Sequence, residues 1–81
     1  MNQNNTIAEL LKYGKSILKE NNIETSSIDA QVLMMYITKL SKVELFSHNT
    51  DTVNEQQCKH YIELIHNRAQ RYPLQYITGM Q

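Results

Sequence analysis

Apolar residues recur at helical spacing in four stretches of the chain. In the first stretch they fall on one face of a helix that begins after Thr6: Ile7, Leu10, Leu11, Gly14, Ile17 and Leu18. Thr6 and Glu9 have the spacing of a capping box, which satisfies free backbone N–H groups at a helix start. Gly14 costs this helix up to about 1 kcal/mol relative to alanine. We therefore expect a neighbouring helix to approach closely at Gly14.

The second stretch is apolar on nearly every side, which is typical of a central helix packed against several neighbours. It covers about residues 27–40, and the spacing of Ser26 and Asp29 indicates a capping box at its start. Ser41 and Glu44 repeat the capping spacing before a short third helix.

The fourth stretch predicts the longest helix, from Thr52 to about Tyr72. Its predicted core face consists of Cys58, Tyr61, Ile62, Ile65, Ala69 and Tyr72. Pro73 ends the helix because it has no backbone N–H and disfavours a helical conformation in the residue before it. The connections are short, so the sequence predicts an all-α bundle of about four helices over residues 6–72, preceded by a disordered N-terminus at residues 1–5.

Residues 73–81 form an apolar junction after the predicted bundle. Residues 75–78 have the β-branched and aromatic character of a strand, and Gly79 suits a hairpin turn. A disordered tail is the alternative, but each large apolar side chain left in water forfeits roughly 1.5–3 kcal/mol. We therefore expect a truncated β-hairpin linker that leads to a further domain, which these 81 residues do not contain.

Composition narrows the function classes. Eight Lys and Arg balance eight Asp and Glu, so the net charge is zero and the electrostatic signature of a nucleic-acid-binding protein is missing. One cysteine permits no internal disulfide and fits a reducing compartment. The polar first residues lack the apolar core of a signal peptide, and no apolar run reaches transmembrane length. The expected location is the cytoplasm.

Residues that could carry chemistry are few. Cys58, His60 and His66 are the metal candidates. One helix presents two ligands to one ion most easily at i,i+3 or i,i+4 spacing, and neither Cys58/His60 nor His60/His66 has that spacing. Only two glycines are present and they lie far apart, so a glycine-rich phosphate loop is excluded. Asp29 and Glu44 fit cap positions better than catalytic acids. We expect no catalytic, cofactor-binding or metal-binding residue.

One flank of the last helix is a candidate contact surface. It carries both arginines of the chain and leads into the junction. Arginine is enriched at protein interfaces, although its stem can equally cover neighbouring apolar side chains. The candidates for contact with a partner or a following domain are Leu64, Arg68, Arg71, Pro73, Gln75 and Tyr76.

Residues 68–79, Arg-Ala-Gln-Arg-Tyr-Pro-Leu-Gln-Tyr-Ile-Thr-Gly, resemble the segment that joins the two domains of HemK/PrmC-type release-factor glutamine methyltransferases. Residues 29–34 resemble the start of the second helix in that family, and residues 41–45 resemble its short following helix. The resemblance extends from about residue 6 to residue 81 and keeps the order of the family's elements.

The resemblance implies transfer of a methyl group from S-adenosylmethionine to the side-chain amide of a glutamine, in the Gly-Gly-Gln motif of bacterial peptide chain release factors. It implies a small N-terminal helical domain that helps to hold the release factor, and a larger α/β domain in cis that binds the cofactor. The catalytic Asn-Pro-Pro-Tyr motif belongs to that second domain and is absent from this sequence. We therefore expect these residues alone to be inactive and to bind no cofactor.

Three alternatives remain. Ribosomal-protein glutamine methyltransferases share a similar junction, although the helix that starts with Asp29 and Ala30 fits the release-factor branch better. A standalone interaction module is the second, for example a nucleic-acid-binding helix-turn-helix made of the third and fourth helices, but the neutral charge argues against it. A helical bundle that pairs with itself is the third.

Overall fold

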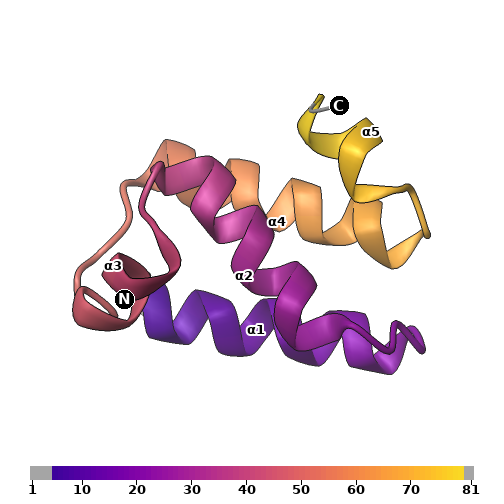
Figure 1. Ribbon diagram of the computed structural model, residues 1–81, viewed down its shortest axis with the longest axis horizontal. Coiled ribbons are helices and arrows are strands. Elements are labelled where there is room, and N and C mark those ends of the chain that lie inside the picture. The colour runs from indigo at the N-terminus through magenta and orange to yellow at the C-terminus, as the bar shows by residue number, and fades with distance from the viewer. Residues whose placement is uncertain (1–4, 80–81) are drawn as a thin grey trace.

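Five helices make up the part of the chain that the structure, a computed structural model, describes, which is residues 5–79. They are α1 (Ile7–Glu20), α2 (Ser26–Thr38), α3 (Lys42–Ser47), α4 (Glu55–Ala69) and α5 (Leu74–Thr78) (Figure 1). The predicted all-α class is confirmed, and residues 5–79 contain no strand. None of these helices is long and apolar enough to cross a membrane.

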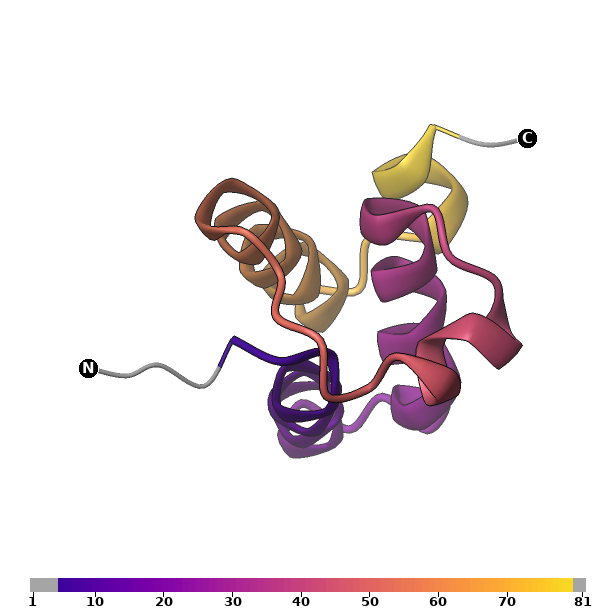
Figure 2. The ribbon, with the colours of Figure 1, turned by 90° about the vertical axis from the view of Figure 1, so that its left-hand side faces the viewer.

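The hydrophobic core lies between α1, α2 and α4, which contact one another in pairs. Figure 2 shows these three helices around the core, with α3 and α5 flanking α2 on either side. The prediction that the second helix is central is therefore confirmed. The buried apolar residues are Ile7, Leu10, Leu18, Ile23, Ala30, Leu33, Met34, Ile37, Leu45, Val53, Cys58, Tyr61, Leu64 and Ile65.

α4 packs tightly against α1 at Gly14. A Cβ atom at this position would lie 2.7 Å from Cδ1 of Ile65 and would also meet the hydroxyl oxygen of Tyr61. That hydroxyl donates a hydrogen bond to the backbone carbonyl of Ala30 at 3.2 Å, so the same layer joins α4 to α2. Burial raises the pKa of Tyr61 well above its usual range. The predicted close approach at Gly14 is confirmed.

The predicted capping signals differ in how well they match the structure. Thr6 caps α1, because its hydroxyl accepts a hydrogen bond from the Glu9 backbone at 3.2 Å. The predicted box at the start of α2 is wrong. Ser26 is the first helical residue there, and the cap position is Thr25, whose hydroxyl donates to the Asp29 carboxylate at 2.8 Å. A helix can thus begin beside a threonine without that threonine accepting a backbone hydrogen bond.

The third capping box is confirmed in full. The Ser41 hydroxyl accepts from the Glu44 backbone at 3.1 Å, and the Glu44 carboxylate accepts from the Ser41 backbone at 2.8 Å. The hydrogen bond from the Ser41 backbone, helped by the Ser41 side chain, lowers the pKa of Glu44. Leu45 is the buried residue of this short helix and is fully enclosed.

The start of α1 is hydrogen-bonded to the loop between α3 and α4. Ile7 and Ala8 donate their backbone N–H groups to carbonyls of this loop, at 3.0 and 2.9 Å. The carbonyl of Asn5 accepts a hydrogen bond from the backbone N–H of Val53 at 2.7 Å. Residues 1–4, which complete the predicted disordered N-terminus, lie outside the described residues.

The fourth helix begins later than predicted. Its cap is Asn54, whose side-chain oxygen accepts a hydrogen bond from the Gln57 backbone at 2.7 Å. Thr52, the predicted start, pairs with Thr6 in an isolated β-bridge instead. This bridge joins the loop before α4 to the cap residue of α1.

The fourth helix also ends earlier than predicted, at Ala69 rather than near Tyr72. Arg71 has a left-handed backbone with φ of 74°, which an α-helix cannot continue through. Tyr72 is consequently an exposed residue and lies outside the core face to which the sequence assigned it. Leu64 takes a core position instead and is 5% exposed.

The predicted strand over residues 75–78 is wrong, because these residues belong to α5. Pro73 is the cap residue, with φ of −60° and ψ of 146°. The Thr78 hydroxyl donates to the carbonyl of Leu74 at 3.0 Å, and Gly79, with φ of 72°, closes the helix. The backbone groups thus pair within one turn rather than with a second strand. Residues 80–81 of the predicted hairpin lie outside the described residues.

Packing explains why the strand-like composition forms a helix. Leu74 and Ile77 are partly buried against the core cluster. Residues three apart lie on the same face of a helix but on opposite faces of a strand. Only the helical conformation therefore turns both side chains toward the bundle, and tertiary packing overrides strand propensity here. The helical part of the structure accordingly reaches beyond residue 72.

Candidate functional site

The six residues predicted for partner or interdomain contact occupy three different environments. Leu64 is in the core. Arg68 and Arg71 form hydrogen bonds within the bundle. The junction residues Pro73, Gln75 and Tyr76 are exposed on the surface, and Tyr76 is 75% exposed. Only this third group is free of the core and of the arginine contacts described below.

Arg68 forms an ion pair with Asp29. Its Nε donates to the Asp29 Oδ2 at 2.8 Å, and the carboxylate side chain is only 4% exposed. The Thr25 hydroxyl donates to the same oxygen at 2.8 Å. A second guanidinium nitrogen of Arg68 donates to the backbone carbonyl of Tyr72 at 3.0 Å. One side chain therefore neutralises a buried charge at the start of α2 and holds the segment that follows α4.

Arg71 forms the second connection. Its guanidinium donates to the backbone carbonyls of Asn21 and Asn22, at 3.1 and 3.3 Å, where α1 ends. The sequence did not reveal either connection, because the partners lie in other helices. One signal was present: an aspartate inside the apolar second stretch needs a cation if it is buried.

α3 and α5 flank α2 in the ribbon view of Figure 2. Side chains of these three helices and of the α2–α3 connection line a groove. Its volume is about 520 Å³ and its lining is mostly apolar. The lining residues are Val32, Met35, Tyr36, Lys39, Leu40, Ser41, Glu44 and Thr78. The sequence assigned the apolar members of this set to a central helix packed against several neighbours. The structure leaves these apolar residues half-buried around the C-terminal half of α2, where they line the groove.

Two charged residues frame the groove. The Lys39 ammonium lies 4.8 Å from the centroid of the Tyr36 ring, within the range of a cation–π interaction. Glu44 lies on the α3 side and is held by its capping hydrogen bonds. An apolar floor with one positive and one negative residue at its rim suits a protein surface more than a small charged ligand.

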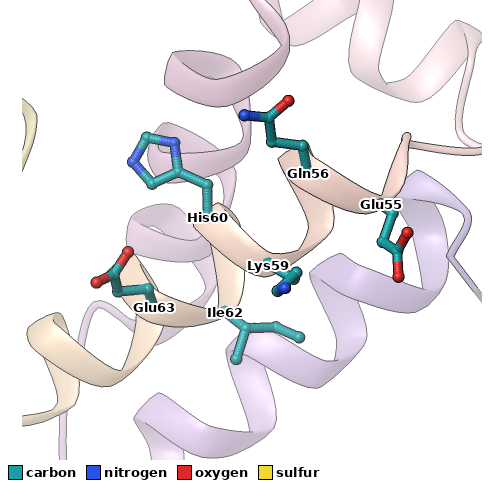
Figure 3. Close-up of a pocket in the computed structure, with 6 residues that line it drawn as sticks. All are labelled: Glu55, Gln56, Lys59, His60, Ile62 and Glu63. Carbon is teal, nitrogen blue, oxygen red and sulfur yellow. The ribbon is translucent and has the colours of Figure 1, made fainter.

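The outer face of α4 is a second, more polar depression, shown in Figure 3. It is lined by Glu55, Gln56, Lys59, His60, Ile62 and Glu63. Figure 3 shows these side chains spreading around one helix rather than pointing to a common centre. Among residues 5–79, no group of three His, Cys, Asp or Glu side chains could hold a metal ion. Nothing in this face assembles a reactive centre.

The chain is similar over nearly its whole length to known proteins. Residues 9–79 match the family described as the PrmC N-terminal domain. A release factor glutamine methyltransferase of Clostridium acetobutylicum is 32% identical over 72 residues, which are 89% of this chain and 25% of that protein. Another of Leptospira interrogans is 30% identical over 81 residues, all of this chain and 28% of that protein.

The matches cover most of this chain but only part of each relative. The chain spans about a quarter of the length of the relatives it matches. No solved structure matches the chain at the significance that these relatives reach. The matched range covers α2 to α5 completely and most of α1, so it includes both arginines and the groove. By this match, the chain belongs to the PrmC N-terminal domain family.

Proposed function

We propose that the chain is the substrate-binding N-terminal domain of an S-adenosylmethionine-dependent N5-glutamine methyltransferase. Its substrate would be the Gly-Gly-Gln motif of bacterial peptide chain release factors. The observation that carries the proposal is the family match over residues 9–79, together with relatives named release factor glutamine methyltransferase. Those names favour a release factor over a ribosomal protein as the substrate. The function places the protein in the bacterial cytoplasm.

The domain's role in this proposal is positional. The chemistry belongs to a catalytic domain in cis, which would bind the cofactor, while the helical bundle holds the release factor. Holding two reactants in the correct geometry can supply several kcal/mol of barrier reduction without any reactive side chain. The described residues fit such a role, since their candidate surface is an apolar groove rather than a cluster of acids, bases or nucleophiles.

The α2–α3–α5 groove is the face that we assign to the release factor. Interface cores are depleted in charge and enriched in aromatic residues and methionine, and the groove presents Met35 and Tyr36. Tyr76 lies on α5, which borders the groove. Its ring packs edge-on against the Tyr72 ring, with the two ring centroids 5.7 Å apart. Arg68 and Arg71 contribute less directly, because their guanidinium groups already bond to the bundle.

Replacing Met35 with glutamate is expected to weaken binding of a release factor by about tenfold or more, because a charge would enter an apolar contact. Isothermal titration calorimetry of residues 1–81 against a purified release factor measures the effect. Ile62→Glu is the matched control. Ile62, like Met35, is a partly buried apolar residue against the core, but it lies on the outer face of α4 (Figure 3).

The pair of variants separates docking from folding. Both substitutions cost stability, so circular dichroism must first show that each variant is folded at the titration temperature. Equal affinities for Met35→Glu and the original chain would remove the groove from the interface. No binding by the original chain would contradict the proposed function itself.

Residues 1–81 are expected to show no methyltransferase activity and no measurable affinity for S-adenosylmethionine. The physical reason is the lack of any glycine-rich loop, since the two glycines are Gly14, packed against Tyr61, and Gly79, at the end of α5. Calorimetric titration with the cofactor tests this expectation. Micromolar or tighter binding would contradict the division of labour between this domain and a catalytic domain.

A further inference from the structure

We propose that Arg68 and Arg71 are positioning residues which fix the direction in which the chain leaves the bundle. The inference rests on the proposed function in one respect, namely that the polypeptide beyond α5 carries the catalytic groups. Its structural part stands independently, on the hydrogen bonds of the two guanidinium groups. Neither arginine would touch the reacting atoms.

Arg68 ties the end of α4 to the start of α2. Its Nε contacts the buried Asp29 carboxylate at 2.8 Å, and its terminal nitrogen contacts the carbonyl of Tyr72 at 3.0 Å. The Thr25 hydroxyl bonds to the same carboxylate oxygen, so the anchor point is itself held by two donors. Because both contacts come from one planar group, the carbonyl of Tyr72 has a fixed place relative to α2.

Arg71 ties the same segment to the end of α1. It donates to the carbonyls of Asn21 and Asn22 at 3.1 and 3.3 Å. Its own backbone is left-handed, with φ of 74°, which an arginine adopts only at an energetic cost. A glycine or asparagine would take this conformation more easily. The arginine is therefore better explained by its side-chain contacts than by the turn.

These two connections set the position of α5. Tyr72, whose carbonyl Arg68 holds, follows Arg71 in the sequence and directly precedes Pro73, the cap of α5. α5 in turn borders the groove through Thr78, and Leu74 and Ile77 pack on the core. Any polypeptide that follows α5 thus starts from a fixed point beside the groove. A release factor bound in the groove would be presented to the catalytic domain in one orientation.

The experiment has a structural arm and a kinetic arm. Arg71→Asn removes the guanidinium and keeps a residue that tolerates positive φ, while Lys59→Asn removes a similar charge from the exposed face of α4 as a control. In residues 1–81, ¹⁵N relaxation should give backbone order parameters for α5 of about 0.85 in the original and control chains, and below about 0.6 in Arg71→Asn. Order parameters in α1 and α2 should stay unchanged.

In the full-length enzyme, Arg71→Asn is expected to lower kcat by roughly tenfold or more, because a small misplacement of bound reactants is costly. KM for the release factor should change less than kcat does, because the α2 and α3 sides of the groove keep their positions and only its α5 side becomes mobile. Arg68→Lys keeps a cation beside Asp29 and loses only the forked contact that also reaches Tyr72. Because one of its two contacts is kept, it should lower kcat by less than Arg71→Asn does.

Two results would overturn the inference. One is a rigid α5 in Arg71→Asn, and the other is a mobile α5 with kcat unchanged. A failure of the proposed function looks different: the unmodified full-length protein would not methylate a release factor, while the relaxation arm would still report whether the arginines hold α5.

Discussion

Replacing Gly14 with alanine is expected to destabilise the domain by about 1–3 kcal/mol, although alanine is the better helix former. The added methyl group would lie 2.7 Å from a side-chain atom of Ile65 and would meet the Tyr61 hydroxyl oxygen. Both neighbours are fully buried, so they have no free volume into which to move. The loss from overpacking therefore exceeds the gain of up to about 1 kcal/mol in helix propensity.

Urea unfolding of residues 1–81 measures this effect, and a double-mutant cycle assigns its cause. Tyr61→Phe alone removes the hydrogen bond to Ala30 and should cost about 1 kcal/mol. It also removes one of the atoms that the Gly14→Ala methyl would meet, the Tyr61 hydroxyl oxygen. The double variant should therefore be more stable than the sum of the single effects predicts, by at least about 0.5 kcal/mol. Strict additivity would contradict the proposed contact.

Leu45→Ala is expected to have the largest effect of any substitution in α3, a loss of about 2–5 kcal/mol in the free energy of unfolding. α3 has six residues, and an isolated helix of that length is unstable in water. Its capping box satisfies the first backbone groups, but Leu45 is the fully buried side chain that joins it to the core. Truncation would leave a cavity and would release the helix at the same time.

Val43→Ala is the matched control, because Val43 lies in the same helix and is 74% exposed. Its free energy of unfolding should change by no more than about 0.5 kcal/mol. Chemical denaturation gives both values, and amide exchange in α3 should speed up only in Leu45→Ala. Similar costs for the two substitutions would mean that α3 is stabilised by its own sequence rather than by docking.

Local and periodic signals carried the correct predictions. Thr6 and the Ser41/Glu44 pair are caps whose partners lie within the same turn, so residue types and spacing suffice to identify them. Gly14 was identified because a glycine in an apolar helix face needs a packing reason, and the structure supplies one. The three long helices and the all-α class follow from the same periodicity.

The incorrect predictions concern residues whose conformation depends on distant partners. The segment predicted as a strand, residues 75–78, is helical because Leu74 and Ile77 both pack on the bundle. The fourth helix stops at Ala69 because Arg71 takes a left-handed conformation and bonds to the end of α1. Neither cause is visible in a short window of sequence, since each requires knowing which helices are neighbours.

The candidate site was predicted only in outline. The flank with both arginines was identified, but the sequence could not show that Asp29, at the start of α2, would occupy the guanidinium of Arg68. The groove was missed for a related reason. A helix that is apolar on nearly every side predicts packing against several neighbours, and periodicity alone does not show that Met35 and Tyr36 stay half-buried.

The loop between α3 and α4 also links two ends of the domain that are far apart in the sequence. Its carbonyls accept the N–H groups of Ile7 and Ala8, which would otherwise be unpaired donors at the start of α1. The first turn of α1 therefore cannot fray unless the loop opens with it. We therefore expect these two segments to unfold locally as one cooperative unit, which lies at the opposite end of α1 from the carbonyls that hold Arg71. Motion at the start of the domain can thus remain separate from motion at its exit.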